Sequence, residues 1–471
     1  MFIAWRLFYV LIASPPVTAA AGLAFRLVRL VFGEHRAEGL LAAADRRFVR
    51  SGWPYQSKGW TNLHMARWLT RVRRWPAQRR PPRPPFGAGN RRLRVGIVGP
   101  FSGLLGFPAR LFQAFPPAAE LTIFDYAYDD RYASYLRPLA AQYVAMPRGS
   151  SSAEVSDAAG AIEREDVDLL VNVLAKRPVF DLLDRLHVRC IAHYCNGSEP
   201  LYHDAVDFQL YPQPEADYFV AGSRLFCTTT MSWFSHQPFF PVTPHYDVRD
   251  IDPVTPCWPQ REPVIVYHGS LYKLANPGYL AILFQLLRED RVLRLVVMGK
   301  DDGSALTTIR AEAAKHDVAS QVHYCGQFSS TRNAEGAVDD PGWAQMRQLL
   351  ARARLAANPW PVGGGSARVE AYAAGVPCIA VRLSFDKLAW NRRQLVSCDV
   401  PAIHAQAGTV TAASEYLELS RRCLYDEKFF ERVVADQRTV LQRLTDAPGW
   451  WAQVFVAHDR WKSGAGAELS S

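Results

Sequence analysis

The sequence predicts an α/β protein built from two doubly wound domains that face each other across a cleft. From residue 93 onwards, short apolar runs of strand length alternate with helix-like segments, and the alternation begins again near residue 263. The 471 residues are enough for two or three domains, and the 49% hydrophobic content is that of an ordinary globular protein. Because such sheets bind ligands at the carboxyl ends of their strands, the cleft is the expected ligand site.

The expected domain boundaries follow shifts in composition. A basic, apolar and helical extension spans residues 1–74, and a Pro/Arg-rich linker spans residues 75–92. The first sheet domain is expected at 93–255 and the second at 256–445. A last helix and tail are expected at 446–471.

In the first domain, apolar runs predict strands, and longer segments between them predict helices. The strands are expected at 93–98, 121–126, 167–173 and 187–194. The helices are expected at 108–115 and 153–165. A glycine loop, residues 99–103, follows the first of these strands.

The second domain repeats this pattern. Strands are expected at 264–268, 293–298 and 322–324, and helices at 279–288, 305–316 and 342–353. Residues 410–443 are expected to be helical. Four aromatic residues after this segment could pack a last helix back across the first domain: Trp450, Trp451, Phe455 and Trp461.

The most informative stretch runs from Asn358 to Val381. Its prolines favour an extended start, and Gly363, Gly364 and Gly365 allow a ligand to approach the main chain closely. We expect Ser366 to be the N-cap of a helix over 367–374, Gly375 to end it, and 376–381 to form a buried strand. A glycine loop before a helix N-terminus is suited to binding an anion.

Glu370 lies one turn into this helix and can point toward the same ligand. A carboxylate there would repel a phosphate, but it would accept hydrogen bonds from ribose hydroxyls, as in dinucleotide sites. The alternative is a purely structural loop between a strand and a helix. The glycines alone do not decide between the two interpretations.

The N-terminal extension differs from the rest of the chain in charge. Residues 1–94 hold 18 Lys and Arg against three acidic residues, a net charge of +15 in a chain of +9, so the remainder carries −6. The run 7–25 is uncharged and could just span a bilayer, although Pro15 and Pro16 interrupt it. We expect residues 1–50 to contact an anionic membrane surface.

Positive charge follows the apolar run more than it precedes it, so the positive-inside rule places the body in the cytoplasm, at the inner face of the plasma membrane. The competing interpretation is a soluble helical cap on the first domain, with the two prolines as a bend. A signal peptide fits less well, because the eight cysteines form no CxxC pair and indicate free thiols in a reducing compartment. Nucleic acid is not an expected partner, since no nucleic-acid motif accompanies the basic extension.

The second domain resembles nucleotide-sugar glycosyltransferases of the GT-B type, and within them the O-linked N-acetylglucosamine transferase family and its bacterial relatives without tetratricopeptide repeats. The segment 268–277, HGSLYKLANP, is similar to the family's strand, turn and "YK-I-x-P" helix start. The loop 358–377 is similar to its "D-x-x-P-x-x-G-x-T-T" loop. In the first domain, segments 167–172, 189–194 and 207–208 follow the family's order of motifs, so the resemblance covers roughly residues 93–400.

The sequence also departs from the family's pattern. Asn358 replaces the usual Asp, Ser366 and Ala367 replace two threonines, and Phe107 replaces the histidine of the first glycine loop. Met346 stands near the place of the family's base-contacting histidine. The nucleotide-binding fold is therefore better supported than the identity of the donor, and nothing in the sequence identifies the acceptor.

The resemblance implies a UDP-sugar donor and transfer without a cofactor or a metal ion. The chain has no DxD triplet in a suitable loop, and Asp301-Asp302 is interpreted as a polar turn. Lys273 could stabilise the departing diphosphate as the main catalytic cation. The expected nucleotide-binding residues are Ser270, Lys273, Gly364, Gly365, Ser366, Ala367 and Glu370.

An inverting transfer to a protein, glycan or lipid acceptor also needs a base. Glu199 and His203 are the candidates that we favour, with Asp204 and His193 beside them, although His193 lies in a strand and is expected to be a core residue. Two alternatives stay open: a nucleotide-sugar-binding protein without catalysis, and a retaining GT-B enzyme. The retaining class carries two glutamates separated by seven residues, and Val362 stands where the first would precede Glu370.

Overall fold

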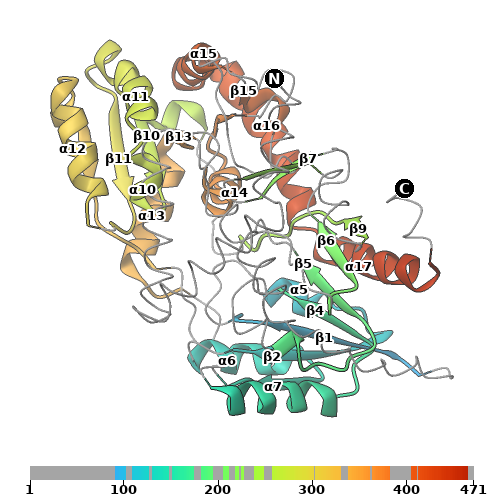
Figure 1. The fold of residues 1–471 in the computed structure, drawn as a ribbon. Helices are drawn as coiled ribbons and strands as arrows, with labels where there is room; N and C mark the ends of the chain where they lie inside the picture. Colours follow the sequence, from blue (N-terminus) through green and yellow to red (C-terminus); the bar gives the residue numbers. More distant parts are fainter. Residues whose placement is uncertain are drawn as a thin grey trace, which may run out of the picture.

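The structure is a computed structural model with two parallel sheets, each covered by helices on both faces (Figure 1). It describes residues 91–101, 109–126, 130–147, 151–173, 182–194, 205–211, 218–221, 224–227, 238–248, 257–301, 303–329, 338–360, 363–381, 405–410 and 412–464. The predicted N-terminal extension and most of the predicted linker lie outside these residues. The predicted α/β class with two doubly wound units is confirmed.

The first sheet has the strand order β3-β2-β1-β4-β5-β6-β9, and every neighbouring pair is parallel. This is the doubly wound order, extended by β9 at one edge. Its strands are β1 (Leu93–Gly99), β2 (Ala119–Asp125), β3 (Gln142–Ala145), β4 (Leu169–Asn172), β5 (Ile191–Tyr194), β6 (Phe208–Tyr211) and β9 (Phe239–Pro241). The strands predicted at 93–98, 121–126, 167–173 and 187–194 are confirmed as β1, β2, β4 and β5.

The helices of this unit divide between the two faces of the sheet. They are α5 (Ala109–Gln113), α6 (Asp130–Leu136), the 3₁₀ turn η1 (Arg137–Leu139) and α7 (Ser152–Arg164). Val95 and Ile97 of β1 point into one core, whereas Val98 points into the other, as expected for alternating side chains of a strand. Sheet faces that are both buried explain the nearly continuous apolar runs in the sequence.

The C-terminal helix α17 (Ala447–Lys462) returns to the first sheet and lies beside β6 and β9 (Figure 1). Trp450 and Trp451 are almost fully buried there, and Trp451 Nε1 donates a hydrogen bond of 2.7 Å to Leu111 O of α5. Phe115 and Tyr194 pack edge-on against this tryptophan pair. The structure thus confirms that the last helix packs across the first unit, as the aromatic residues predict.

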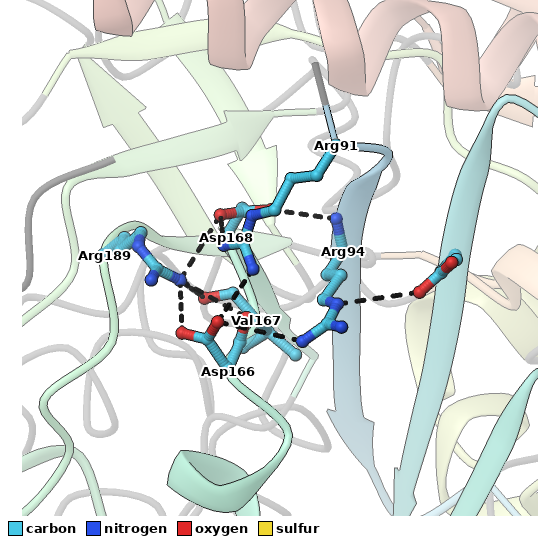
Figure 2. Close-up of polar contacts among 7 residues, drawn as sticks. Arg91, Arg94, Asp166, Val167, Asp168 and Arg189 are labelled. Atoms are coloured by element: carbon cyan, nitrogen blue, oxygen red, sulfur yellow. Dashed lines mark hydrogen bonds and ion pairs between the residues drawn. The ribbon is translucent and has the colours of Figure 1, made fainter. Parts of the chain in front are cut away.

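A cluster of charged side chains closes the amino-terminal edge of the first sheet (Figure 2). Arg91 donates to Asp166 at 2.8 Å and to Asp168 at 2.6 Å, and Arg189 lies 2.6 Å from Asp166 and 3.3 Å from Asp168. The backbone N–H of Arg94 donates to the second oxygen of Asp168. Hydrogen bonds from Arg189 and Arg91 hold the pKa of Asp166 below its ordinary value.

The second sheet has the order β12-β11-β10-β13, again with parallel neighbours. Its strands are β10 (Glu262–His268), β11 (Arg294–Met298), β12 (Val322–Tyr324) and β13 (Ala353–Ala356). A single bridge between Ala356 and Cys378 continues it toward the small pair β14 (Ala380–Val381) and β15 (Thr409–Val410). The predicted strand at 376–381 is therefore shorter than expected, because only this bridge and β14 pair with neighbours.

Helices again cover both faces of the second sheet. They are α10 (Leu271–Leu274), α11 (Pro277–Glu289), α12 (Ala305–Lys315), α13 (Pro341–Arg352), α14 (Gly365–Ala373), α15 (Ala413–Tyr425) and α16 (Glu427–Leu444), with the 3₁₀ turns η2 (Trp258–Gln260), η3 (Ala319–Gln321) and η6 (Gln406–Gly408). Residues from α11, α12 and α15 fill one core, and residues from α13, α14 and α16 fill the other.

The structure differs from the sequence predictions in two places. The helical segment expected at 410–443 is two helices, because the side chain of Asp426 accepts from Phe429 N and caps a new helix there. An antiparallel hairpin of β7 (Tyr218–Ala221) and β8 (Arg224–Cys227) was not expected. No helix within the described segments is both long and apolar enough to cross a membrane, and the run 7–25 lies outside them.

Candidate functional site

The candidate site lies at the carboxyl ends of β10 and β13. In the order β12-β11-β10-β13, the chain adds β11 and β12 on one side of β10 and β13 on the other. The loops that leave β10 and β13 therefore diverge at this point, and open α/β sheets bind their ligands at such a switch point. The segments that follow these two strands are the two on which the sequence analysis places the donor site.

The turn after β10 depends on two glycines in close contact. Gly269 and Gly299 both have positive φ angles, and a Cβ on Gly299 would lie 1.7 Å from Gly269 O. Gly269 N donates to Met298 O, and Leu271 N donates to Lys300 O, so the turn is fixed to the end of β11. This turn places Ser270, which is exposed, at the N-cap of α10 and directs Lys273 toward β13.

Lys273 meets the glycine loop directly. Its Nζ donates a hydrogen bond of 3.1 Å to Gly363 O, across 90 residues of sequence. The ammonium group therefore lies beside the loop that leads into α14. The sequence predicts both a cation and a glycine loop at this site, and the structure brings the two together.

The loop enters α14 earlier than predicted. Gly364 is the N-cap and the helix begins at Gly365, so the expected N-cap Ser366 is wrong by two residues and lies exposed in the first turn. The cause is Asn358, whose Oδ1 accepts from Gly364 N at 3.0 Å and holds the loop from its own start. The N–H groups of the first turn have no acceptor within the helix, and Ser366 and Ala367 belong to this turn.

Glu370 sits one turn into α14, as predicted, and points toward the end of β10. Its Oε2 lies 2.9 Å from Nε2 of His268, the last residue of that strand. The His268 side chain is 3% exposed and the Glu370 side chain is 18% exposed, so the carboxylate is the part of the pair that reaches the surface. In the sequence, His268 stands out only as part of a motif, and its contact with Glu370 is not predicted. The available signal was an ionisable residue ending a buried strand.

Aromatic side chains pack together at the residue that leads into the glycine loop. Trp360 packs edge-on against Tyr279 and Tyr416, and the hydroxyls of the two tyrosines are 2.7 Å apart. Burial raises the pKa of both tyrosines above the ordinary value, so both remain neutral. This aromatic packing fixes the position of Trp360, just before the glycine loop.

Other candidate residues near this edge are structural. Met346 is fully buried in the core beneath α13, so it does not contact a ligand. Asp301 accepts from the backbone N–H groups of Ala305 and Leu306 at the start of α12, in agreement with its interpretation as a polar turn. In the part of the chain that the structure describes, no group of three or more His, Cys, Asp or Glu residues could hold a metal ion.

Comparison with known proteins finds this architecture in solved glycosyltransferase structures. A mutant of the O-GlcNAc transferase of Thermobaculum terrenum matches 97% of this chain and 82% of its own, with a TM-score of 0.66 and 15% sequence identity. HepE of Anabaena, in a complex with UDP, matches over 78% of this chain and all of its own, with a TM-score of 0.50 and 10% identity. The chain has the GT-B fold.

A third GT-B structure, a glycosyltransferase from Rickettsia africae, matches over 78% of this chain and 97% of its own, with a TM-score of 0.50 and 10% identity. Compared by sequence, the chain matches no protein-family model and no curated protein. At these identities the likeness shows the fold alone.

The residues that the sequence suggests as the catalytic base for the acceptor all belong to the first unit. Glu199, His203 and Asp204 lie outside the described residues. His193 is fully buried in β5, and its Nδ1 lies 3.0 Å from Asn172 Nδ2 of β4. Its expected role as a core residue is confirmed.

Proposed function

We propose that the protein is a glycosyltransferase that moves a sugar from a UDP-sugar to a protein, glycan or lipid acceptor, with inversion and without a metal ion. The observation that carries this proposal is the contact between Lys273 Nζ and Gly363 O at the switch point of the second sheet. It places a cation, a glycine loop and a helix N-terminus around one position. A diphosphate is the ligand that these three features have in common.

The donor would bind across the two loops. The diphosphate would accept hydrogen bonds from Lys273, from Ser270 and from the N–H groups of Gly364, Gly365, Ser366 and Ala367. Glu370 would accept hydrogen bonds from the ribose hydroxyls, since a carboxylate so close to a diphosphate is favoured only where it meets donors. This division of roles follows from the sign of each group's charge.

The reaction breaks the bond between the sugar C1 and the β-phosphate oxygen, while an acceptor oxygen or amide nitrogen forms a new bond to C1. Negative charge then develops on the leaving UDP, where Lys273 and the helix N–H groups stabilise it without a metal ion. The proton of the acceptor passes to a base, for which Glu199 and His203 are the proposed candidates. UDP-sugars are made in the cytoplasm, which is the proposed location of the protein.

The first prediction tests the role of Lys273. Lys273→Ala is expected to lower kcat with a UDP-sugar, because the leaving diphosphate loses its cation. The activation free energy should rise by about 2–4 kcal/mol. The unfolding midpoint is expected to change little, since the side chain is only half-buried. Released UDP, measured by a coupled assay over a panel of UDP-sugars, gives the rate.

Lys315→Ala is the matched control. Lys315 is exposed on α12 of the same unit and pairs with Glu312 within that helix, so its loss should leave turnover unchanged. Equal kcat in Lys273→Ala and the unaltered protein would remove Lys273 from the mechanism. UDP affinity without transfer or hydrolysis of any donor would identify a binding protein without catalysis, and retention of the anomeric configuration in the product would assign the retaining class.

A further inference from the structure

His268 is a residue to which the proposed chemistry gives no role. The proposed donor contacts come from Ser270, Lys273, the glycine loop and Glu370, whereas His268 joins β10 to α14 across 102 residues of sequence. An imidazole that is 3% exposed has lost its hydration, and burying a polar ring is favourable only where it is hydrogen-bonded. Its Nε2 has that partner in Glu370 Oε2, at 2.9 Å.

The direction of this hydrogen bond follows from the chemistry of the two groups. An ionised carboxylate only accepts, so Nε2 carries the proton and donates to Oε2. Glu370 then has Oε1 and the remaining lone pair of Oε2 for another donor. The carboxylate is the exposed end of the pair, at 18%, and it lies one turn from the anion-binding start of α14.

A free glutamate side chain has several rotamers, and ordering it on ligand binding costs conformational entropy. His268 removes that cost in advance, because it sits on a buried strand whose end is fixed by the Gly269–Gly299 contact. Phe328 lies near the imidazole, with ring centroids 6.4 Å apart. The imidazole is therefore a fixed donor that holds the Glu370 side chain in one rotamer.

We infer that His268 is a positioning residue that fixes the Glu370 carboxylate to receive the two hydroxyls of a ribose diol. The ligand class is a ribonucleoside diphosphate or its sugar ester, and a 2′-deoxyribonucleotide is disfavoured because it lacks one donor. The inference rests on the proposed function, since Glu370 acts on a nucleotide. His268 itself does not touch the ligand.

The test compares UDP with 2′-deoxy-UDP, both measured by calorimetry on the full chain. The unaltered protein is expected to bind UDP at least about tenfold more tightly, as expected for a hydrogen bond to a charged group. In His268→Leu this ratio should fall toward one, because UDP loses two hydroxyl contacts to Glu370 whereas 2′-deoxy-UDP, which keeps its 3′-hydroxyl, loses only one. His268→Gln should restore much of the ratio, because its amide can donate from a similar position.

Glu370→Gln provides a second variant that does not depend on how well His268→Leu folds. It should lower the ratio by itself, and adding His268→Leu to it should change the ratio no further, because two residues that act through one contact are not additive. His316→Leu is the matched control, since His316 forms a histidine–glutamate pair with Glu312 on the surface of α12. That variant should keep the full ratio.

The outcomes separate the two proposals. A ratio that His268→Leu and Glu370→Gln leave unchanged, in a protein that binds UDP, overturns the positioning role and leaves the glycosyltransferase proposal standing. A parallel loss of UDP and 2′-deoxy-UDP binding in His268→Leu also overturns it, because a structural defect acts on both ligands. An unaltered protein that binds neither UDP nor its deoxy form overturns the proposed function together with the inference.

Discussion

At the scale of single residues, the charges at the amino-terminal edge of the first sheet show how burial determines the contribution of an ion pair to stability. Asp168 accepts hydrogen bonds from Arg91 and from the N–H of Arg94 and forms an ion pair with Arg189 (Figure 2). Its side chain is only 7% exposed, whereas that of Asp166 is 47% exposed. Water screens the second carboxylate, so its pairs contribute little individually. Asp166 also has a φ of 45°, a backbone conformation that Asp and Asn tolerate better than most residues do.

We predict that Asp166→Asn lowers the free energy of unfolding by up to about 1 kcal/mol near neutral pH. Asparagine keeps the tolerance for positive φ and removes only the charge. Because the folded-state pKa of Asp166 is lowered, its contribution is complete above the unfolded value of 3.8 and is lost as pH falls through the folded value. Urea unfolding of both proteins at several pH values should show a difference that shrinks only below about pH 4.

Asp157→Asn is the control, because Asp157 is exposed on α7. Its unfolding curve should match that of the unaltered protein at each pH. A stability difference for Asp166→Asn that persists unchanged into acid would show that the carboxylate charge is not the cause.

The sequence predicts Lys273, Glu370 and the glycine loop as candidate site residues, because each has a local signature: a cation, an acid one turn into a helix, and three glycines before that helix. It does not identify the His268–Glu370 contact. That contact depends on how the end of strand β10 and helix α14 meet in space across 102 residues, and neither segment by itself predicts the other. For the same reason the sequence shows Asn358 only as a replacement for an acidic residue and does not predict that its Oδ1 accepts a hydrogen bond from Gly364 N.

At the scale of elements, strands with both faces buried were the easiest to predict. β1, β2, β10 and β11 each contain a short apolar run, and the structure places all four in the interior of a parallel sheet. Shorter elements such as β9 and β14 have too few residues to show any periodicity. The start of α14 was misplaced because its N-cap is stabilised by a side chain from outside the helix.

The packing of α17 on the first sheet leads to a prediction at this scale. Trp451→Phe should lower the free energy of unfolding by about 2–4 kcal/mol, since the variant loses buried volume and one hydrogen bond. The bond matters because Leu111 O is in the last turn of α5, where carbonyls have no partner within the helix. The shift of the denaturation midpoint at a constant slope measures this loss.

Val456→Ala is the matched change on the same helix. Val456 is 56% exposed, so its truncation should alter the midpoint only slightly. Similar losses for the two variants would show that the Trp451 contact is not the cause of the destabilisation.

At the scale of the whole molecule, the charge is divided between a basic extension and a mildly acidic body. A net charge of +15 over residues 1–94 suits an anionic surface, whereas the rest of the chain carries −6. We propose that residues 1–50 hold the GT-B body at the inner face of a membrane. Each basic residue near an anionic surface adds about 1 kcal/mol.

We predict that the full chain sediments with anionic vesicles at low salt and that a chain without residues 1–50 stays in the supernatant. Salt should weaken the association, since it screens the basic residues. Neutral phosphatidylcholine vesicles are the control and should bind less. A full chain that remains soluble at low salt, together with a shortened chain that aggregates, would establish the helical cap instead.

The return of α17 also affects how the protein is made on the ribosome. Trp451 meets Leu111 across 340 residues, so this part of the first apolar core is completed only when nearly the whole chain has been translated. At 5–20 residues per second this interval lasts roughly 20–70 s. During that time α5 and α6 can pack on the first sheet, but the apolar surface that Trp450 and Trp451 contact in the finished protein stays exposed to solvent.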